Sequence, residues 1–110
     1  MTRYHESETL IAEAEAAERR GDDERARAAY RTAAELQWAM VCELPAERTI
    51  TKSIFGSSAA TLFWRAGDLD EAKRLADSLL VESWIYGHAS MRLRQLLGRI
   101  RAEKAMRNRL

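Results

Sequence analysis

The sequence is poor in cysteine, proline and glycine, and each shortage excludes a class of protein. The single cysteine, Cys42, cannot form an internal disulfide, and nothing else in the sequence indicates an oxidising compartment. Five glycines and one proline are too few for the many turns of a β-sandwich or β-barrel. Alanine, the strongest helix former, instead supplies 19 of the 110 residues. The composition therefore predicts an all-α protein.

Long apolar runs and catalytic signatures are missing as well. No stretch approaches the roughly 18–20 apolar residues that span a bilayer, and residues 1–8 are too polar for a signal peptide. The sequence has no Gly-rich phosphate loop, no G-x-S-x-G and no H-E-x-x-H. Neither His5 nor His88 has a Cys, His or Asp at metal-ligand spacing. We therefore expect no enzymatic activity, cofactor, metal or membrane partner, and a cytoplasmic location.

A regular set of turn signals divides the chain into five segments of helical length. The signals are Gly21-Asp22, Pro45, Gly67-Asp68 and Gly87. The helices predicted between them cover about residues 6–20, 23–44, 49–66, 69–81 and 89–106. At the two Gly-Asp pairs we expect the glycine to end one helix in the left-handed conformation and the aspartate to cap the next. Asp68 and Glu71, three residues apart, fit a capping box.

Sliding the chain on itself by 46 residues aligns the two Gly-Asp turns and reveals an internal repeat. The same shift superposes Ala14 on Ala60 and Ala26 on Ala72. The repeat unit is a helical hairpin, which buries its apolar face only against a neighbour. We therefore predict one helical-repeat domain over residues 1–110. It would consist of a first hairpin at about 6–44, a second at about 49–82, and a C-terminal basic helix at about 89–107 that caps the second hairpin.

These hairpins resemble tetratricopeptide repeats over most of residues 7–82. Gly21 and Gly67 match the turn glycine of the family, Ala26 and Ala72 match its second-helix alanine, and Tyr30 matches the aromatic residue that follows. The resemblance implies a small bacterial helical-repeat protein of TPR-like type. It further implies that a partner protein or peptide binds in a groove lined by the first helix of each hairpin. Such a protein acts as an adaptor, a chaperone-like protein or a regulatory subunit.

The chain departs from this family in its period and in its helix ends. The family repeats every 34 residues or so, whereas this chain repeats every 46 because its second helix is about three turns longer. Trp38 and Trp84 stand where the family has a helix-ending proline. We therefore expect a compact bundle derived from the repeat in place of a regular superhelix.

The expected core includes specific residues of the second and third helices. Ile50 and Ile54 are among the apolar residues that we expect on the buried side of the third helix. Cys42 is expected to be a small core residue of the second helix. The run of small residues from Gly56 to Ala60 predicts that the backbone of a neighbouring helix approaches closely, which would offset the poor helix propensity of Gly56.

Trp64 is the strongest candidate for a partner-binding residue. Tryptophan is enriched in binding hot spots, and the repeat shift places Trp64 on a first helix. The other candidates are its neighbours Ser57, Thr61 and Arg65 and their counterparts in the first hairpin, Glu15 and Glu18. With Glu at one end and Arg at the other, such a groove suits an extended peptide of mixed charge. The alternative is that the three tryptophans fill gaps where the hairpins meet.

The C-terminal helix carries a strong excess of positive charge. Residues 92–109 hold seven bases and one acid, whereas residues 1–24 hold eight acids and three bases. The candidate basic patch consists of Arg92, Arg94, Arg99, Arg101 and Lys104. This helix is either a solvated face, a docking surface for an acidic protein, or a surface that binds the nucleic-acid backbone.

The position of the two charged ends in the fold decides between two kinds of association. If the acidic and basic ends lie apart, we expect head-to-tail contact between copies or binding of a charged partner. A self-assembling structural homo-oligomer is therefore an alternative to the adaptor. If the two ends pack together, the partner surface must be the apolar groove.

Overall fold

The chain folds into five α-helices, and no strand occurs among the residues that the structure describes. The computed structural model describes residues 2–109. Its helices are α1 (Thr2–Arg19), α2 (Asp23–Glu43), α3 (Thr49–Arg65), α4 (Leu69–Leu80) and α5 (Gly87–Asn108). The predicted all-α class is therefore confirmed, and α2 to α5 begin and end within two residues of the expected positions.

α1 begins closer to the N-terminus than the apolar pattern indicated, because its first turns are held by residues with little hydrophobic signal. The Tyr4 ring lies edge-on against the Phe55 ring of α3, with the ring centres 5.9 Å apart. Ser7 is fully buried, and its hydroxyl donates to the Tyr4 carbonyl at 2.8 Å. A polar residue thus occupies the helix interface.

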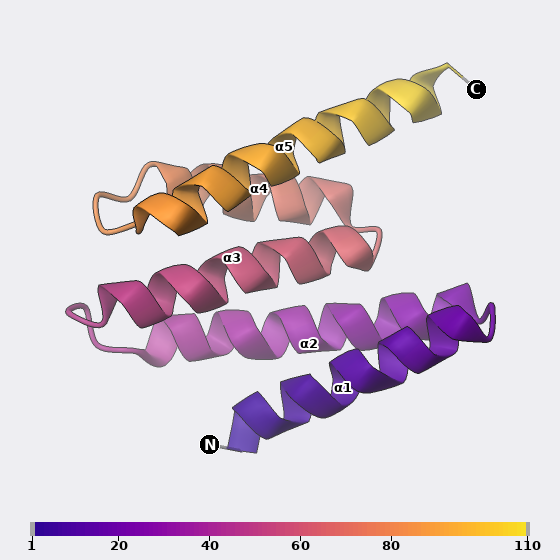
Figure 1. Ribbon diagram of the computed structural model, residues 1–110, viewed down its shortest axis with the longest axis horizontal. Helices are drawn as coiled ribbons and strands as arrows, with labels where there is room; N and C mark the ends of the chain where they lie inside the picture. Colours follow the sequence, from indigo (N-terminus) through magenta and orange to yellow (C-terminus); the bar gives the residue numbers. More distant parts are fainter. Residues whose placement is uncertain (1, 110) are drawn as a thin grey trace.

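Successive helices run antiparallel and stack into a flat slab of 42 × 34 × 17 Å (Figure 1). α1 packs against α2, α2 against α3, and α3 against α4, while α5 closes the stack against both α3 and α4. In Figure 1, α1, α3 and α5 lie toward the viewer and α2 and α4 lie behind them. The arrangement is two antiparallel hairpins followed by a closing helix, as predicted, and it makes α1, α3 and α5 one face of the molecule.

The two Gly-Asp turns have the same geometry, in agreement with the 46-residue shift. Gly21 and Gly67 adopt the left-handed conformation, with φ of 78° and 83°. At the first turn, the Gly21 N–H donates to the Glu18 carbonyl at 3.0 Å, and the Asp22 N–H donates to the Ala17 carbonyl at 2.9 Å. The residues 46 positions further on form the same two bonds at the second turn. These bonds satisfy the free carbonyls of a helix end, so both turns close in the Schellman pattern.

The two aspartates that follow the glycines differ in what they bind. Asp22 caps α2 as predicted, because its carboxylate accepts the Arg25 N–H at 3.3 Å. The capping box predicted for Asp68 is wrong, since its side chain makes no cap bond. Arg31 of α2 instead donates to both Asp68 carboxylate oxygens, at 2.6 and 2.8 Å. A guanidinium matches a carboxylate in this two-bond geometry, so Asp68 ties α2 to the start of α4.

The helices approach closely because much of the core is alanine. The fully buried alanines are Ala14, Ala17, Ala33, Ala34, Ala59, Ala60, Ala72 and Ala76. Gly56 lies beneath Leu79 of α4, and a Cβ at Gly56 would come within 3.2 Å of a Leu79 methyl. The small-residue run therefore admits a close neighbour, which is a leucine side chain where a backbone was expected.

Two expectations about burial were wrong. Ile50 and Ile54 are each 56% exposed, because they lie on the side of α3 that the first turn of α5 leaves open. Cys42 is exposed, although the sequence predicted it in the core. Val41, one residue earlier, is buried, and neighbouring helix residues point about 100° apart because a turn holds 3.6 residues. Cys42 therefore faces away from the core.

Candidate functional site

One groove crosses the face made by α1, α3 and α5, and it consists of three adjoining hollows. The apolar hollow, of about 360 Å³, is lined by Ile50, Ile54, Ser57, Tyr86, His88, Ala89 and Arg92. The central hollow, of about 180 Å³, is lined by Thr61, Trp64, Arg92, Gln95, Leu96 and Arg99. The charged hollow, of about 350 Å³, is lined by Glu18, Asp23, Ala26, Arg27, Trp64, Arg65, Gly67 and Glu103. Arg92 borders the first two hollows and Trp64 the last two, so each hollow adjoins the next.

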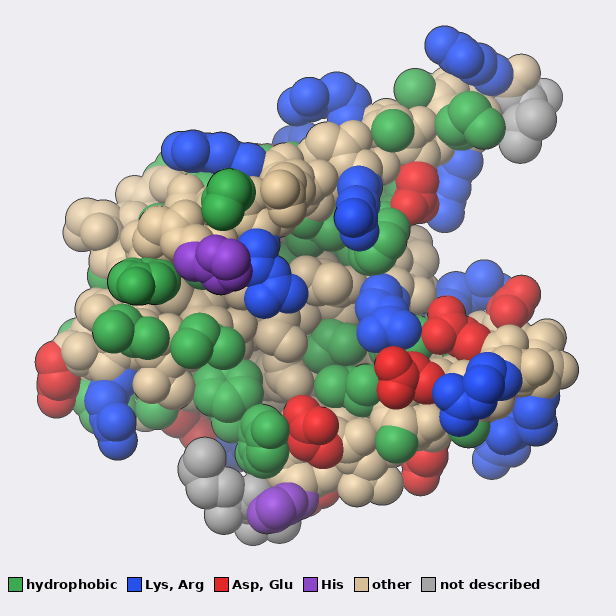
Figure 2. Space-filling view, in the orientation of Figure 1, with side chains coloured by type: hydrophobic (Ala, Val, Ile, Leu, Met, Phe, Trp, Pro, Cys, Tyr) green, Lys and Arg blue, Asp and Glu red, His purple; other side chains and the backbone are tan. Residues whose placement is uncertain are grey.

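Figure 2 shows how side chains of each kind are distributed over this face. Hydrophobic side chains gather at the left and in the middle, over α1, α3 and the start of α5. Acidic and basic side chains crowd the right end, where the α1–α2 turn lies, and the surface is hollowed between them and the end of α5. The groove therefore changes from apolar to charged along its length.

Trp64 joins α3 to α5 at the centre of the groove. Its Nε1 donates to the Glu103 carboxylate at 2.7 Å, and the Arg99 guanidinium lies 5.5 Å from its ring centre. Glu103 is the one acid among the basic residues 92–109. No pattern in the sequence predicted that it would accept a hydrogen bond from Trp64. Trp64 is only half-buried, so it both fills a gap between helices and contributes surface to the central and charged hollows.

Glu15, Glu18 and Arg65 lie together, which corrects the expectation that Glu and Arg would mark opposite ends of the groove. The Arg65 guanidinium lies 3.8 Å from the Glu15 carboxylate and 3.5 Å from the Glu18 carboxylate. α1 and α3 are equivalent helices of two stacked hairpins, so they run in the same direction and their C-terminal ends meet at one edge. The charges at this edge largely satisfy one another.

Tyr30 of α2 supports this charged cluster from below. Its side chain is fully buried, its hydroxyl donates to the Glu18 carboxylate at 2.5 Å, and the Arg65 guanidinium lies 4.3 Å above its ring centre. Burial raises the pKa of the Tyr30 hydroxyl to about 12, and the hydrogen bond to Glu18 contributes in the same direction. Tyr30 therefore remains a neutral donor over the whole range in which most proteins are stable.

The raised pKa of Tyr30 predicts a loss of stability at high pH. Between about pH 10, where an unfolded tyrosine ionises, and about pH 12 the folded chain keeps a proton that the unfolded chain has lost. Unfolding then releases a proton, so the free energy of unfolding falls as the pH rises, while the contribution is fully present below this window. We expect the free energy of unfolding of the wild type, measured with urea, to fall by about 1 kcal/mol relative to that of Tyr30→Phe between about pH 9 and 11. A constant difference would contradict the assigned pKa.

Ser57 and Thr61 belong to the groove, but their hydroxyls are already used inside α3. Ser57 is buried and donates to the Ile54 carbonyl at 3.1 Å. Thr61, which is half-buried, donates to the Ser57 carbonyl at 2.9 Å. These two residues therefore shape the floor of the groove, and the donors available to a ligand come from elsewhere.

The five residues of the predicted basic patch lie on different sides of α5. Arg92 and Arg99 line the groove beside α3. Arg101 and Lys104 line a separate hollow beside α4, and Arg94 is exposed and borders neither. The predicted patch is thus divided, and of its five residues only Arg92 and Arg99 line the groove.

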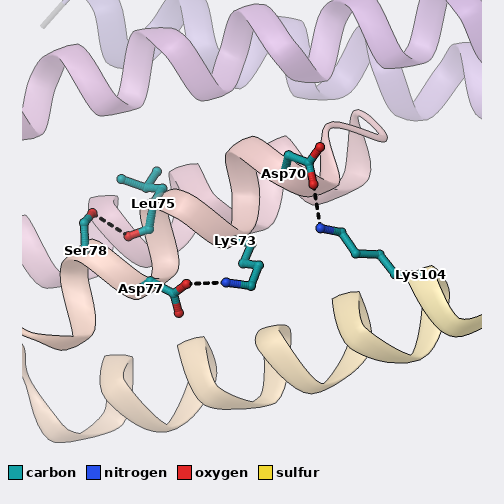
Figure 3. A network of polar contacts seen from close by, with 6 residues as sticks. All are labelled: Asp70, Lys73, Leu75, Asp77, Ser78 and Lys104. Carbon is teal, nitrogen blue, oxygen red and sulfur yellow. Dashed lines mark hydrogen bonds and ion pairs between the residues drawn. The ribbon is translucent and has the colours of Figure 1, made fainter.

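Lys104 is engaged in a contact between α4 and α5. Figure 3 shows its ammonium group pointing at Asp70, with an Nζ–Oδ1 distance of 2.5 Å, beside the Lys73–Asp77 pair at 2.7 Å. The hydrogen bond from Lys104 holds the pKa of the Asp70 carboxyl below its usual range. Lys104 therefore fastens α5 to α4.

The described residues were searched for clusters of metal ligands and for membrane-spanning helices. Over residues 2–109, no three His, Cys, Asp or Glu side chains are placed to hold a metal ion. In the same part of the chain, no helix combines the length and the apolar character that crossing a bilayer requires.

The exposed Ile50–Ile54 pair was predicted to be buried. An apolar stripe that faces the core and one that faces a ligand give the same pattern in a single sequence.

Comparison with known proteins gives no relative from which a function can be transferred. No family model, no curated protein and no solved structure matches the chain. The resemblance to tetratricopeptide repeats therefore stays a prediction, and the functional argument depends on the geometry of the groove.

Proposed function

We propose that this chain is a non-enzymatic protein–protein interaction module that holds an extended segment of a partner protein in the groove beside α3. The observation that carries the proposal is the row of adjoining hollows that leads from the exposed Ile50–Ile54 pair to Trp64. Exposed apolar side chains beside a half-buried tryptophan are typical of interaction hot spots. The TPR-like resemblance favours the same kind of partner, in an adaptor, chaperone-like or regulatory role. The lone cysteine supports a cytoplasmic place of action.

The groove is tested by a charge placed at its apolar end. We expect random peptides displayed on phage to yield binders of the wild type that lose binding to Ile54→Glu, because a carboxylate would occupy the apolar hollow. Both this substitution and its control, Val81→Glu, change an exposed apolar residue, and Val81 lies outside the groove. The control should bind the same peptides as the wild type. Selected peptides that bind both variants equally would place the interaction elsewhere and overturn the proposal.

Self-association is a second candidate, favoured by the position of the charged ends. The acidic α1 and the basic α5 are the two outer helices of the stack, so the ends of opposite charge lie apart. Attraction between such edges acts over about 10 Å at roughly 0.1 M salt and is screened more strongly at higher salt. Light scattering should then show a larger mass at low salt than at high salt. A monomer at low salt and high protein concentration would remove this candidate.

A nucleic-acid partner has weaker support. The basic residues of α5 lie on more than one side of the helix, and Lys104 is already paired with Asp70. A phosphate chain is bound most tightly where several cations line one path, whereas the pocket-lining cations of α5 are divided between its α3 side and its α4 side.

A further inference from the structure

We propose that the segment bound in this groove is acidic and carries an aliphatic anchor next to its first carboxylate. The anchor would enter the apolar hollow between Ile50, Ile54 and Tyr86, and two carboxylates would pair with Arg92 and Arg99. This inference rests on the proposed function, because it assigns the chemistry of the partner that the groove holds.

The charge of the groove selects an acidic partner. His88 and Arg92 are the basic residues that line the apolar hollow, and Arg92 and Arg99 are those that line the central hollow. No acid lines either hollow. Within residues 2–109, Arg92 forms no ion pair and is exposed. Its guanidinium can therefore donate hydrogen bonds to a partner's carboxylate without breaking an ion pair inside the chain.

The spacing of the two arginines sets the spacing of the carboxylates. Arg92 and Arg99 are seven residues apart on the continuous helix α5, which corresponds to about 10.5 Å at roughly 1.5 Å per residue. A chain in the polyproline II conformation advances roughly 3.1 Å per residue with three residues per turn, so carboxylates three residues apart lie on one side of the chain and span about the same distance. Because Arg92 also borders the apolar hollow, the anchor belongs directly beside the first carboxylate, on the side away from the second.

The far end of the groove favours a protein segment as the partner. Three acids, Glu18, Asp23 and Glu103, line the charged hollow beyond Arg99 together with two bases, Arg27 and Arg65. A nucleic acid continuing past Arg99 would bring phosphates against these carboxylates. A peptide can place a neutral or basic residue there, so the change of charge along the groove suits a peptide.

The proposal is tested with a synthetic peptide whose ends are blocked, so that only side chains carry charge. The probe is acetyl-Ser-Gly-Leu-Asp-Ser-Gly-Asp-Ser-Gly-amide, and its binding is measured by isothermal titration calorimetry. We expect it to bind the wild type about tenfold more tightly than peptides in which glycine replaces leucine or lysine replaces both aspartates. Equal binding of the three peptides would overturn the proposal.

Two double variants on α5 separate the groove from the general charge of the helix. Arg92→Glu/Arg99→Glu should weaken binding of the acidic peptide by more than about tenfold. Arg94→Glu/Arg101→Glu changes the net charge by the same amount on residues outside the groove, and should change binding by less than about threefold. Arg92→Gln/Arg99→Gln repeats the first test with a smaller change, and circular dichroism checks that each variant is folded. Equal losses in both pairs would show diffuse attraction and overturn the proposal.

The peptides selected on phage distinguish a failure of this inference from a failure of the proposed function. If they are acidic with an aliphatic residue and depend on Arg92 and Arg99, both are supported. If they are basic or uncharged but still lose binding to Ile54→Glu, the groove function stands and the acidic partner is wrong. If a short oligothymidylate displaces the acidic peptide and binds more tightly, with the same dependence on the two arginines, a nucleic acid replaces the peptide as the partner.

Discussion

Replacing Tyr30 with alanine should lower the free energy of unfolding by about 3–5 kcal/mol. The side chain is fully buried and lies beneath both the α1 acid Glu18 and the α3 base Arg65. Tyr30→Ala removes the ring, leaves a cavity among closely packed helices, and takes away the surface on which the Arg65 guanidinium lies. This loss is a large share of the roughly 5–15 kcal/mol that stabilises a typical domain. Urea unfolding followed by circular dichroism measures it.

Tyr30→Phe is the matched control, because it keeps the ring and removes only the hydroxyl. The Glu18 carboxylate is exposed enough to regain water as a partner, so we expect a loss of about 1 kcal/mol. The difference between the two variants then gives the contribution of the ring. A loss below about 1 kcal/mol for Tyr30→Ala would show that the three helices do not depend on this residue.

The turns and helix bounds could be predicted from the sequence because their causes are local. Gly21 and Gly67 end helices through their own backbone conformation, and Asp22 caps α2 through a residue three positions away. The 46-residue shift then indicated how the helices pack, since two hairpins related by a repeat bury their apolar faces against each other. Five helices in two hairpins and a closing helix followed from these signals.

The errors concern contacts between residues that lie far apart in the chain. Asp68 has a suitable cap position, but Arg31, 37 residues earlier, occupies its carboxylate. Ile50 and Ile54 have a core-like spacing, but their burial depends on where the loop before α5 ends. A short stretch of sequence does not show whether a residue binds its local partner or a distant one. The choice depends on how the other helices pack.

The candidate site shows the same division between local and long-range causes. Trp64 and Arg65 were proposed as site residues from their residue types and their place in the repeat. Their partners, Glu103 and Tyr30, come from helices whose positions the repeat did not fix in detail. The apolar hollow was missed because an exposed isoleucine pair and a buried one give the same pattern.

Because Gly56 contacts Leu79, we expect the effect of Gly56→Ala on the free energy of unfolding to change sign when Leu79 is replaced by alanine. Leu79 is fully buried, and its methyl carbons lie 3.2 and 3.3 Å from the place that a Cβ on Gly56 would take. Leu79→Ala should therefore lower the free energy of unfolding by about 3 kcal/mol, through lost burial and the cavity that it leaves. Gly56→Ala alone should lower it by about 1 kcal/mol, because the strain of displacing a buried leucine exceeds the gain in helix propensity.

In the Leu79→Ala background, Gly56→Ala should instead raise the free energy of unfolding by about 1 kcal/mol. The added methyl then enters the cavity and no longer meets Leu79, so the better helix propensity of alanine is gained without strain. The two single variants and the double variant form a cycle whose coupling free energy should be about 2 kcal/mol, which is typical of residues in direct contact. Gly98→Ala, at an exposed helical position with open space around the Cβ, controls for propensity and should stabilise both backgrounds equally. Additive effects of Gly56→Ala and Leu79→Ala in urea unfolding would show that α3 and α4 do not meet through this pair.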